Sequence, residues 1–369
     1  MRMTERIVRP LLSALLWIGF AAAPLFAAAQ TYTVTDLGVQ TGYNSSWAIF
    51  INAQGEITGC SDSSTSPSNL CQGYSASAAD LWNGNGLQNI GALPGDDSTA
   101  GYYINDSGYI VGYSAIYEYN SGHAFLWTPT GGMTDLGTLP GGDAYSAAQA
   151  MTSTGVIVGE SLVANGDVDA VLWIPNGGTY QIVDEGTLPG SPYTYPYAIN
   201  GKQQIVGIAY LNQAGTQYHA FSWSQAAGWK DLGTLKGAAK GTVNNSWASW
   251  NNNKGVAVGV STSKKYPNGV AVSWSSAGKI HTIGTLPGGT SSFAGFTTDA
   301  GVVLGESMQP DGFNHAFLWT SKTKFQDLND LIPPNSGWLL NHASAMNASG
   351  QIVGYGTING ATHAFLLTP

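Results

Sequence analysis

A short motif, HAFLW or a close variant, recurs along this chain at a regular interval. It starts at His123, His219, His315 and His363, so the intervals are 96, 96 and 48 residues (219 − 123, 315 − 219 and 363 − 315). Because 96 is twice 48, the repeating unit is about 48 residues long. A fixed period in this range indicates a solenoid, a propeller or an array of repeats.

Each unit contains four short apolar segments separated by turn residues. In the second unit these are Ala100–Asn105, Tyr109–Ser114, His123–Thr128 and Met133–Leu139. Segments this short, rich in Val, Ile, Tyr, Phe and Trp and bounded by Gly, Pro, Asn or Asp, are typical of β-strands. Four strands in a repeat of this length are typical of one blade of a β-propeller.

Two markers count the copies. The residue that ends the third segment of each unit is Trp82, Trp127, Trp173, Trp223, Trp274, Trp319 and, in the last unit, Leu367. The glycine of the second segment is Gly59, Gly112, Gly159, Gly207, Gly259, Gly305 and Gly354. Both series have seven members. We therefore expect an all-β, seven-bladed β-propeller with four antiparallel strands per blade.

The two ends of the repeat array are complementary. The last unit stops at Pro369, after its third strand, whereas Thr31–Gly38 resembles a fourth strand without the three before it. An open sheet edge is an aggregation hazard. We therefore expect Thr31–Gly38 to pair with His363–Thr368 and close the last blade. Residues 30–369 then form one propeller, with a closing strand and linker at 30–44 and the repeats at 45–369.

The first 29 residues have the pattern of a secretory signal peptide. Arg2, Arg6 and Arg9 precede an apolar stretch, Leu11–Phe26, and Ala27–Ala29 provides small residues for cleavage before Gln30. The alternative is an uncleaved anchor, but the apolar run is shorter than the ~20 residues that a membrane span needs. We expect a secreted protein, extracellular or periplasmic, with no membrane span after signal removal.

Charge argues against nucleic acid as a partner. Residues 30–369 carry 10 Lys (13 basic residues minus Arg2, Arg6 and Arg9), no Arg and 21 acidic residues (22 minus Glu5), which gives a formal net charge of −11. Clustered Arg and Lys supply most of the affinity for nucleic acids and anionic membranes. We therefore expect no nucleic-acid partner.

The motifs resemble one known family. HAFLW, DLGTLPGG, the pattern IN-x-x-G-x-IVG and the segment Asp327–Trp338 (DLNDLIPPNSGW) are similar to the bacterial HAF-repeat family of secreted proteins, over residues 31–369. Units one, three and five depart from it at Ala79–Trp82, Asp169–Trp173 and Val270–Trp274. The resemblance implies an exported repeat protein and carries no general enzymatic assignment.

The histidine of HAF and the aspartate of DLG occur together. The pairs are His123 with Asp135, His219 with Asp231, His315 with Asp327 and, if the ring closes as expected, His363 with Asp36. Units one and five lack both, which favours a repeated structural hydrogen bond, whereas unit three is discordant, with Asp169 and Asp184 in the two positions. A hairpin turning near Thr130 would place Asp135 opposite Leu126, so the partners could also meet across a blade boundary or not at all. No spacing suggests a metal ligand set, and we expect neither metal nor cofactor.

Two carboxylates and two cysteines carry possible chemistry. Glu160 and Glu306 share the sequence GES, but they lie three blades apart, whereas two carboxylates that hydrolyse a glycoside as a pair lie about 5–10 Å apart. We therefore interpret both as solvated rim residues and identify no catalytic residue. Cys60 and Cys71 flank the long loop of the first unit, and in an exported chain we expect a disulfide.

Recognition is expected on the face with the variable loops, which join strands two to three and four to one. That face would carry Tyr117, Tyr119, Tyr193, Tyr195, Tyr197, Tyr210, Tyr218 and Tyr266. Tyrosine-rich polar loops on a rigid scaffold suit carbohydrate or protein recognition, although Tyr and Trp also fill blade cores and edges.

The sequence favours a secreted binding or scaffolding propeller without catalysis, with a glycan or an extracellular protein as its ligand. The alternative is a carbohydrate-active enzyme, a hydrolase or lyase, that uses the central funnel. Two or more convergent acidic or His side chains with shifted pKa values would favour the enzyme.

Overall fold

A computed structural model describes residues 31–65, 71, 76–117, 121–142, 144–238 and 242–369. The regular structure of these residues consists of strands and one 3-10 helix, η3 (Leu328–Leu331), which confirms the predicted all-β class. The predicted signal peptide at 1–29 lies outside the described residues. In the described part of the chain, no helix has the length and apolar character that a membrane span requires.

Four sheets are antiparallel meanders of four strands in chain order. One contains β2 (Ser45–Ile51), β3 (Ile57–Asp62), β4 (Ser77–Asn83) and β5 (Gly86–Asn89). The next contains β6 (Ser98–Ile104), β7 (Ile110–Ile116), β8 (Ser121–Thr128) and β9 (Gly132–Asp135). A third contains β18 (Ser246–Asn251), β19 (Ala257–Ser261), β20 (Val270–Trp274) and β21 (Ile280–Gly284). A fourth contains β22 (Ser291–Thr297), β23 (Val303–Met308), β24 (Asn314–Thr320) and β25 (Lys324–Asp327).

Two further meanders share an eight-stranded sheet, joined by the single parallel pair Val168↔Tyr193. The first meander contains β10 (Ser146–Met151), β11 (Ile157–Leu162), β12 (Val168–Asn176) and β13 (Thr179–Gly186). The second contains β14 (Tyr193–Ile199), β15 (Ile205–Tyr210), β16 (Tyr218–Ser224) and β17 (Gly228–Asp231).

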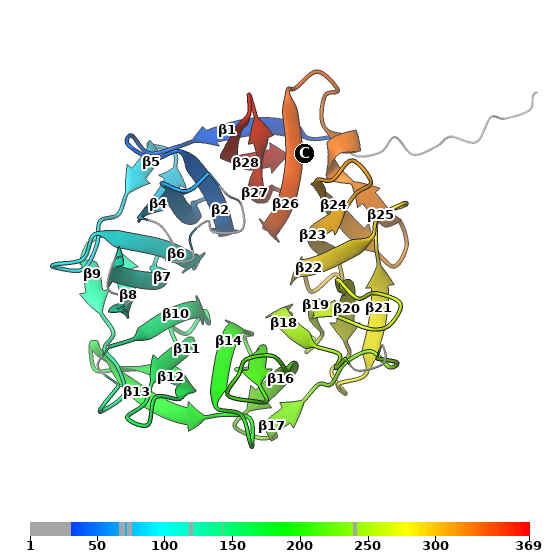
Figure 1. Cartoon of the computed structure of the whole chain (residues 1–369). Coiled ribbons are helices and arrows are strands. Elements are labelled where there is room, and N and C mark those ends of the chain that lie inside the picture. Colours follow the sequence, from blue (N-terminus) through cyan, green and yellow to red (C-terminus); the bar gives the residue numbers. More distant parts are fainter. Residues whose placement is uncertain (1–30, 66–70, 72–75, 118–120, 143, 239–241) are drawn as a thin grey trace, which may run out of the picture. The chain divides into compact units, whose positions relative to one another are not determined.

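The last sheet unites the two ends of the described chain. Its strand order is β1-β28-β27-β26, and it contains β1 (Thr33–Gly38), β26 (Trp338–Met346), β27 (Ile352–Ile358) and β28 (Ala361–Thr368). β1 pairs with β28 in antiparallel register, with Val34 opposite Leu367. The pairing expected from the mismatched ends is therefore present. Within Thr31–Pro369, the sheets follow one another around a central axis (Figure 1). The innermost strands are β2, β6, β10, β14, β18, β22 and β26.

A bulge in the innermost strand explains the repeated glycine. In the first unit, Ala48 pairs with Gly59 and Phe50 with Thr58, so Ile49 is the extra residue. A Cβ on Gly59 would overlap the carbonyl oxygen of Trp47. The equivalent glycine of every other unit meets the same obstacle, so the bulge requires glycine at this position.

Asparagine side chains join the turn after one innermost strand to the turn of the next sheet. Asn52 Nδ2 donates to Asn105 O at 3.0 Å, and Asn200 Nδ2 donates to Asn252 O at 2.9 Å. The same contact links the last sheet to the first, because Asn347 Nδ2 donates to Asn52 O at 3.2 Å. The asparagine of the IN-x-x-G pattern is therefore an inter-sheet tether.

The predicted His–Asp pairs touch. The Nδ1 atoms of His123, His219, His315 and His363 lie 2.6–2.9 Å from the nearer carboxylate oxygens of Asp135, Asp231, Asp327 and Asp36. Asp135 lies opposite Phe125 rather than Leu126. Its side chain therefore reaches His123 diagonally, two residues along the partner strand.

These pairs lie beside a second tether between sheets. Trp82 Nε1 donates to Leu37 O at 2.8 Å, and Trp173 and Trp274 donate to the carbonyls of Leu136 and Leu232. Each accepting leucine follows the aspartate of a His–Asp pair, and each donating tryptophan belongs to a unit that lacks the pair. In each of these contacts, the segment with the His–Asp pair therefore supplies the accepting carbonyl, and the unit without the pair supplies the donating tryptophan.

The predicted disulfide is confirmed. Cys60 and Cys71 are bonded, their Cα atoms lie 5.9 Å apart, and both residues are buried. Tyr102 of the next sheet donates its hydroxyl to Cys71 O at 3.2 Å. The bridge therefore joins Cys71 to β3, and Tyr102 holds Cys71 against the neighbouring sheet.

Cysteines placed in register should link β1 to β28. The pairs Thr33→Cys with Thr368→Cys and Thr35→Cys with Leu366→Cys are opposed across the ladder. We expect a disulfide in at least one of them, because opposed Cβ atoms in an antiparallel pair lie about 4.5–5.5 Å apart. Mass spectrometry of the unreduced protein measures the linkage. Thr35→Cys with Thr362→Cys is the out-of-register control, and equal linkage there would contradict the pairing.

Candidate functional site

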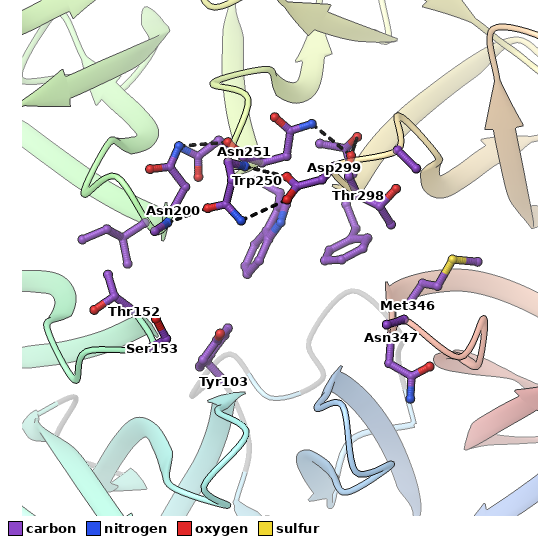
Figure 2. A pocket seen from close by; sticks show the side chains of 18 of the residues that line it. Tyr103, Thr152, Ser153, Asn200, Trp250, Asn251, Thr298, Asp299, Met346 and Asn347 are labelled. Atoms are coloured by element: carbon purple, nitrogen blue, oxygen red, sulfur yellow. Dashed lines mark hydrogen bonds between the residues drawn. The ribbon is translucent and has the colours of Figure 1, made fainter.

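Two cavities meet at the turns that follow the innermost strands. One has a volume of about 480 Å³ and the other about 270 Å³, and both are lined by Tyr103, Ser153, Met346 and Asn347. We call them together the turn-side funnel. Figure 2 shows the first cavity, with Tyr103 and Trp250 pointing into it from opposite sides. The recognition face expected from loop length is the opposite one, because these turns are short.

Four aromatic rings pack together where the funnel meets the axis. Phe50 lies 4.4 Å from Tyr103, 5.1 Å from Trp250 and 6.0 Å from Phe296, measured between ring centroids. All four side chains occupy the same register position, two residues after the alanine or glycine opposite the repeated glycine. The other three units have Ala150, Ala198 and Ala345 there. Large aromatic side chains therefore line the axis in some units, and small alanine side chains line it in the others.

A buried acid lies on β11, away from the residues that line the funnel. Glu160 is 1% exposed, and its Oε1 accepts hydrogen bonds from Tyr145 at 2.9 Å and from Gln149 at 3.0 Å. Its Oε2 has no hydrogen-bond partner. Burial raises the pKa of Glu160 to about 8, although the two hydrogen bonds oppose the shift. We call Glu160, Tyr145 and Gln149 the Glu160 cluster.

Further tyrosines surround this cluster. The negative charge of Glu160 adds to burial in raising the pKa values of Tyr102, Tyr145 and Tyr197, and it contributes to raising that of Tyr113 to about 12. The phenols therefore remain protonated at neutral pH and act as hydrogen-bond donors. The interpretation of Glu160 as a solvated rim residue was wrong, because Tyr145 and Gln149 cover its carboxyl group.

Glu306, in the same GES sequence, has a different partner. Its Oε2 lies 3.0 Å from His342 Nδ1, and its side chain is 22% exposed. His342 stacks on Tyr355, with 5.5 Å between ring centroids, and lies parallel to Phe293 at 6.1 Å. Glu306 thus contacts a histidine beside an aromatic stack, and the rim interpretation holds for it only in part.

Unit three replaces the histidine with a second carboxyl group. Burial, reinforced by the charge of Asp184, raises the pKa of Asp169 to about 6. Asp80 in the first unit is fully buried, and burial raises its pKa to about 7 despite a 2.6 Å hydrogen bond from Ser61. These two acids and Glu160 are thus carboxyl groups with raised pKa values, which the sequence patterns did not indicate.

The predicted tyrosines do not form one surface. Tyr193, Tyr195 and Tyr218 each contact the ring of Tyr210 at 5.5–6.4 Å, and Tyr218 also contacts Trp247. Tyr197 is instead the bulge residue of β14.

The other predicted tyrosines lie apart from this group. Tyr266 packs against the core beneath Lys265, and Tyr117 is 40% exposed. Tyr119 lies outside the described residues. Sequence spacing found the Tyr210 group but could not foresee the funnel, which depends on packing across the axis.

Solved structures resemble this fold at low sequence identity. A puromycin-hydrolysing peptidase of Mycobacterium tuberculosis matches with a TM-score of 0.56 and 10% identity, over 91% of this chain and 56% of its own. One of two prolyl endopeptidases matches with a TM-score of 0.56 and 11% identity, over 88% and 50%. An acylaminoacyl peptidase of Pyrococcus horikoshii matches with a TM-score of 0.53 and 8% identity, over 92% and 53%. The chain spans about half the length of these proteins. No protein-family model and no curated protein sequence matches it.

These comparisons overturn one expectation. The sequence favours a protein without catalysis, whereas the three matching structures described above are peptidases. The preference against an enzyme was therefore wrong. At identities of 8–11%, the likeness itself shows a shared fold, and the activities named are those of the other proteins.

Glu160 should make stability depend on pH. Folding raises its pKa from 4.5 to about 8, so its contribution to the free energy of unfolding is present below pH 4.5 and lost as the pH rises through 8. We expect wild-type protein to lose on the order of a few kcal/mol relative to Glu160→Gln between about pH 5 and pH 9. Thermal unfolding of both proteins across this pH range measures the difference in stability. Asp80 also has a raised pKa, but it is present in both proteins, so its contribution cancels in the difference. Parallel curves would contradict the shift.

Proposed function

We propose that this chain is a seven-bladed β-propeller, closed by its N-terminal strand, that hydrolyses glycosidic bonds with Glu160 as proton donor. The architecture is supported by the strand orders, because five four-stranded sheets and two meanders within an eight-stranded sheet make seven groups. The resemblance to HAF-repeat proteins and the pattern of residues 1–29 support export from a bacterial cell. The seven-bladed architecture and the export are therefore both proposed.

A single observation carries the hydrolytic part. Glu160 is a carboxyl group that stays protonated at neutral pH, because burial raises its pKa to about 8. In the cleavage of a glycosidic bond such an acid protonates the departing oxygen, and the water that attacks the anomeric carbon then returns a proton to the Glu160 carboxylate. The likeness of the fold to three peptidases supports hydrolysis as the reaction class, whereas the protonated carboxyl group favours glycosides over peptides as substrates.

The two carboxyl oxygens of Glu160 differ in their hydrogen bonds. Tyr145 and Gln149 both donate to Oε1, so this oxygen is held as an acceptor. Oε2, which has no partner, is then the oxygen that carries the proton. Gln149 is only partly buried and is the bulge residue of β10, on the axial side of the sheet. A substrate reaches Oε2 by displacing Gln149.

A turnover screen with matched variants tests the proposal. We expect purified protein to hydrolyse members of a panel of neutral aryl glycosides and oligosaccharides, and Glu160→Gln to lower kcat by about 10²- to 10⁴-fold, the usual contribution of a general acid. Released sugar and aryl alcohol are the readouts. Aryl amides of peptides serve as the competing substrate class.

Glu306→Gln is the control, since Glu306 has the same local sequence and strand position but pairs with His342. It should keep kcat within about threefold, as expected for a residue away from the chemistry. The proposal fails if wild-type protein turns over no glycoside, if it cleaves only the amides, or if Glu160→Gln is as active as wild type.

A further inference from the structure

We infer that the turn-side funnel is a binding site for the end of a neutral saccharide chain, separate from the Glu160 cluster. The inference does not depend on the proposed hydrolysis, because it concerns different residues and is tested by binding. Its basis is the combination of aromatic surface, unused hydrogen-bonding groups and absent positive charge in one cavity.

The aromatic surface has the form that sugar rings use. Tyr103 and Trp250 are stacked, with an interplanar angle of 20° and 6.2 Å between centroids. Both side chains are partly exposed and line the 480 Å³ cavity. A cavity of this size lies within the ordinary range for small-ligand sites. The C–H face of a sugar ring packs on such rings, while its hydroxyl groups remain available to polar neighbours.

Polar groups in the funnel lack partners. No hydrogen bond to a described residue uses the Tyr103 hydroxyl group or Trp250 Nε1. Asn251, which is 3% exposed, donates through Nδ2 to Gln204 O, but its Oδ1 has no partner. Burial, aided by the charge of Asp106, raises the pKa of Tyr103 to about 12, so its hydroxyl group stays a donor. Two donors and one acceptor match the alternating chemistry of sugar hydroxyl groups.

Charge narrows the ligand class to neutral molecules. None of the described residues that line the two cavities is Lys, Arg or His, and Asp106 and Asp299 line one cavity each. Both aspartates already accept backbone N–H groups, from Ala53 at 3.0 Å and from Asn253 at 2.8 Å. Phosphates, sulfates and uronates would meet negative charge without compensation.

The rim is held in place before a ligand arrives. Asn252 Nδ2 donates to Thr298 O at 2.9 Å, and Gly201 N donates to Asn253 Oδ1 at 2.8 Å. The turns after β14, β18 and β22 are thereby fixed to one another along one side of the opening, where Figure 2 draws the hydrogen bonds as dashed lines. A rim that is already ordered loses little conformational freedom on binding, which favours affinity for a small ligand.

Calorimetry with defined oligosaccharides tests the site. The probes are maltotriose, cellotriose, mannotriose and chitotriose, with trigalacturonate as the anionic comparison and a Phe-Gly dipeptide as the comparison for an aromatic peptide. Titrations use wild-type protein and Glu160→Gln, so that hydrolysis and binding are separated. We expect at least one neutral trisaccharide to bind both proteins equally, and trigalacturonate to bind at least tenfold more weakly.

Conservative variants locate the binding. Tyr103→Phe removes one oxygen and Trp250→Phe removes Nε1, and each should weaken binding by about 2- to 12-fold, the effect of one lost hydrogen bond. Tyr109→Phe and Trp229→Phe are the matched controls, because neither residue lines the funnel. Each control should leave affinity unchanged. Melting curves check that all four variants are folded.

Four results would overturn the inference. These are no binding of any neutral trisaccharide at millimolar concentration, equal binding of trigalacturonate, binding of the dipeptide alone, or affinity unaffected by both funnel variants. Loss of hydrolysis in Glu160→Gln with binding retained supports both sites. Binding without hydrolysis in wild-type protein rejects the proposed function and leaves the funnel site standing.

Discussion

The fold depends on polar side chains of one sheet that satisfy backbone groups of the next. A four-stranded meander has two faces and cannot bury either one alone. Asn52, Asn200 and Asn347 meet this need at one end of the innermost strands, where each donates to a carbonyl of the neighbouring sheet. Trp82 and its equivalents do so at the outer edge. Such contacts fix the angle between sheets as well as their distance, because hydrogen bonds are directional.

Local patterns in the sequence were sufficient for the strands and for the pairing of the ends. Short apolar segments between turn residues predicted the meanders, and the spare segment at Thr31–Gly38 predicted the partner of β28. The contacts between sheets could not be predicted from local patterns, because donor and acceptor are far apart in the sequence. They are 37 residues apart in Trp173 and Leu136 and 53 in Asn52 and Asn105. The co-occurrence of His and Asp was visible in the sequence. Its alternation with the tethered tryptophans became clear only from the contacts.

Glu160 and Glu306 show why the candidate site could not be predicted from motifs. Both follow the repeated glycine and precede serine, and both pair across the strand with an inner residue, Ala147 or Phe293. Their environments differ because the side chains that reach them come from elsewhere. Tyr145 arrives from the connection before β10, whereas His342 belongs to a neighbouring sheet. A small residue at position 147 leaves room for burial of the acid, whereas the ring of Phe293 belongs to the stack beside His342.

Departures from the repeat therefore mark the places where the ring becomes specific. A strictly repeated inner strand would line the axis with the same side chain in every unit. Here four units place aromatic rings at one register position, and three place alanine there. Phe50 contacts the other three rings, so the large side chains gather on one part of the axis. The alanine side chains of the other three units are smaller and leave more space beside the axis. The differences between units that weaken the sequence repeat thus explain why the cavity has aromatic rings on one side. Identical side chains in every unit would have left either a uniform channel or no cavity.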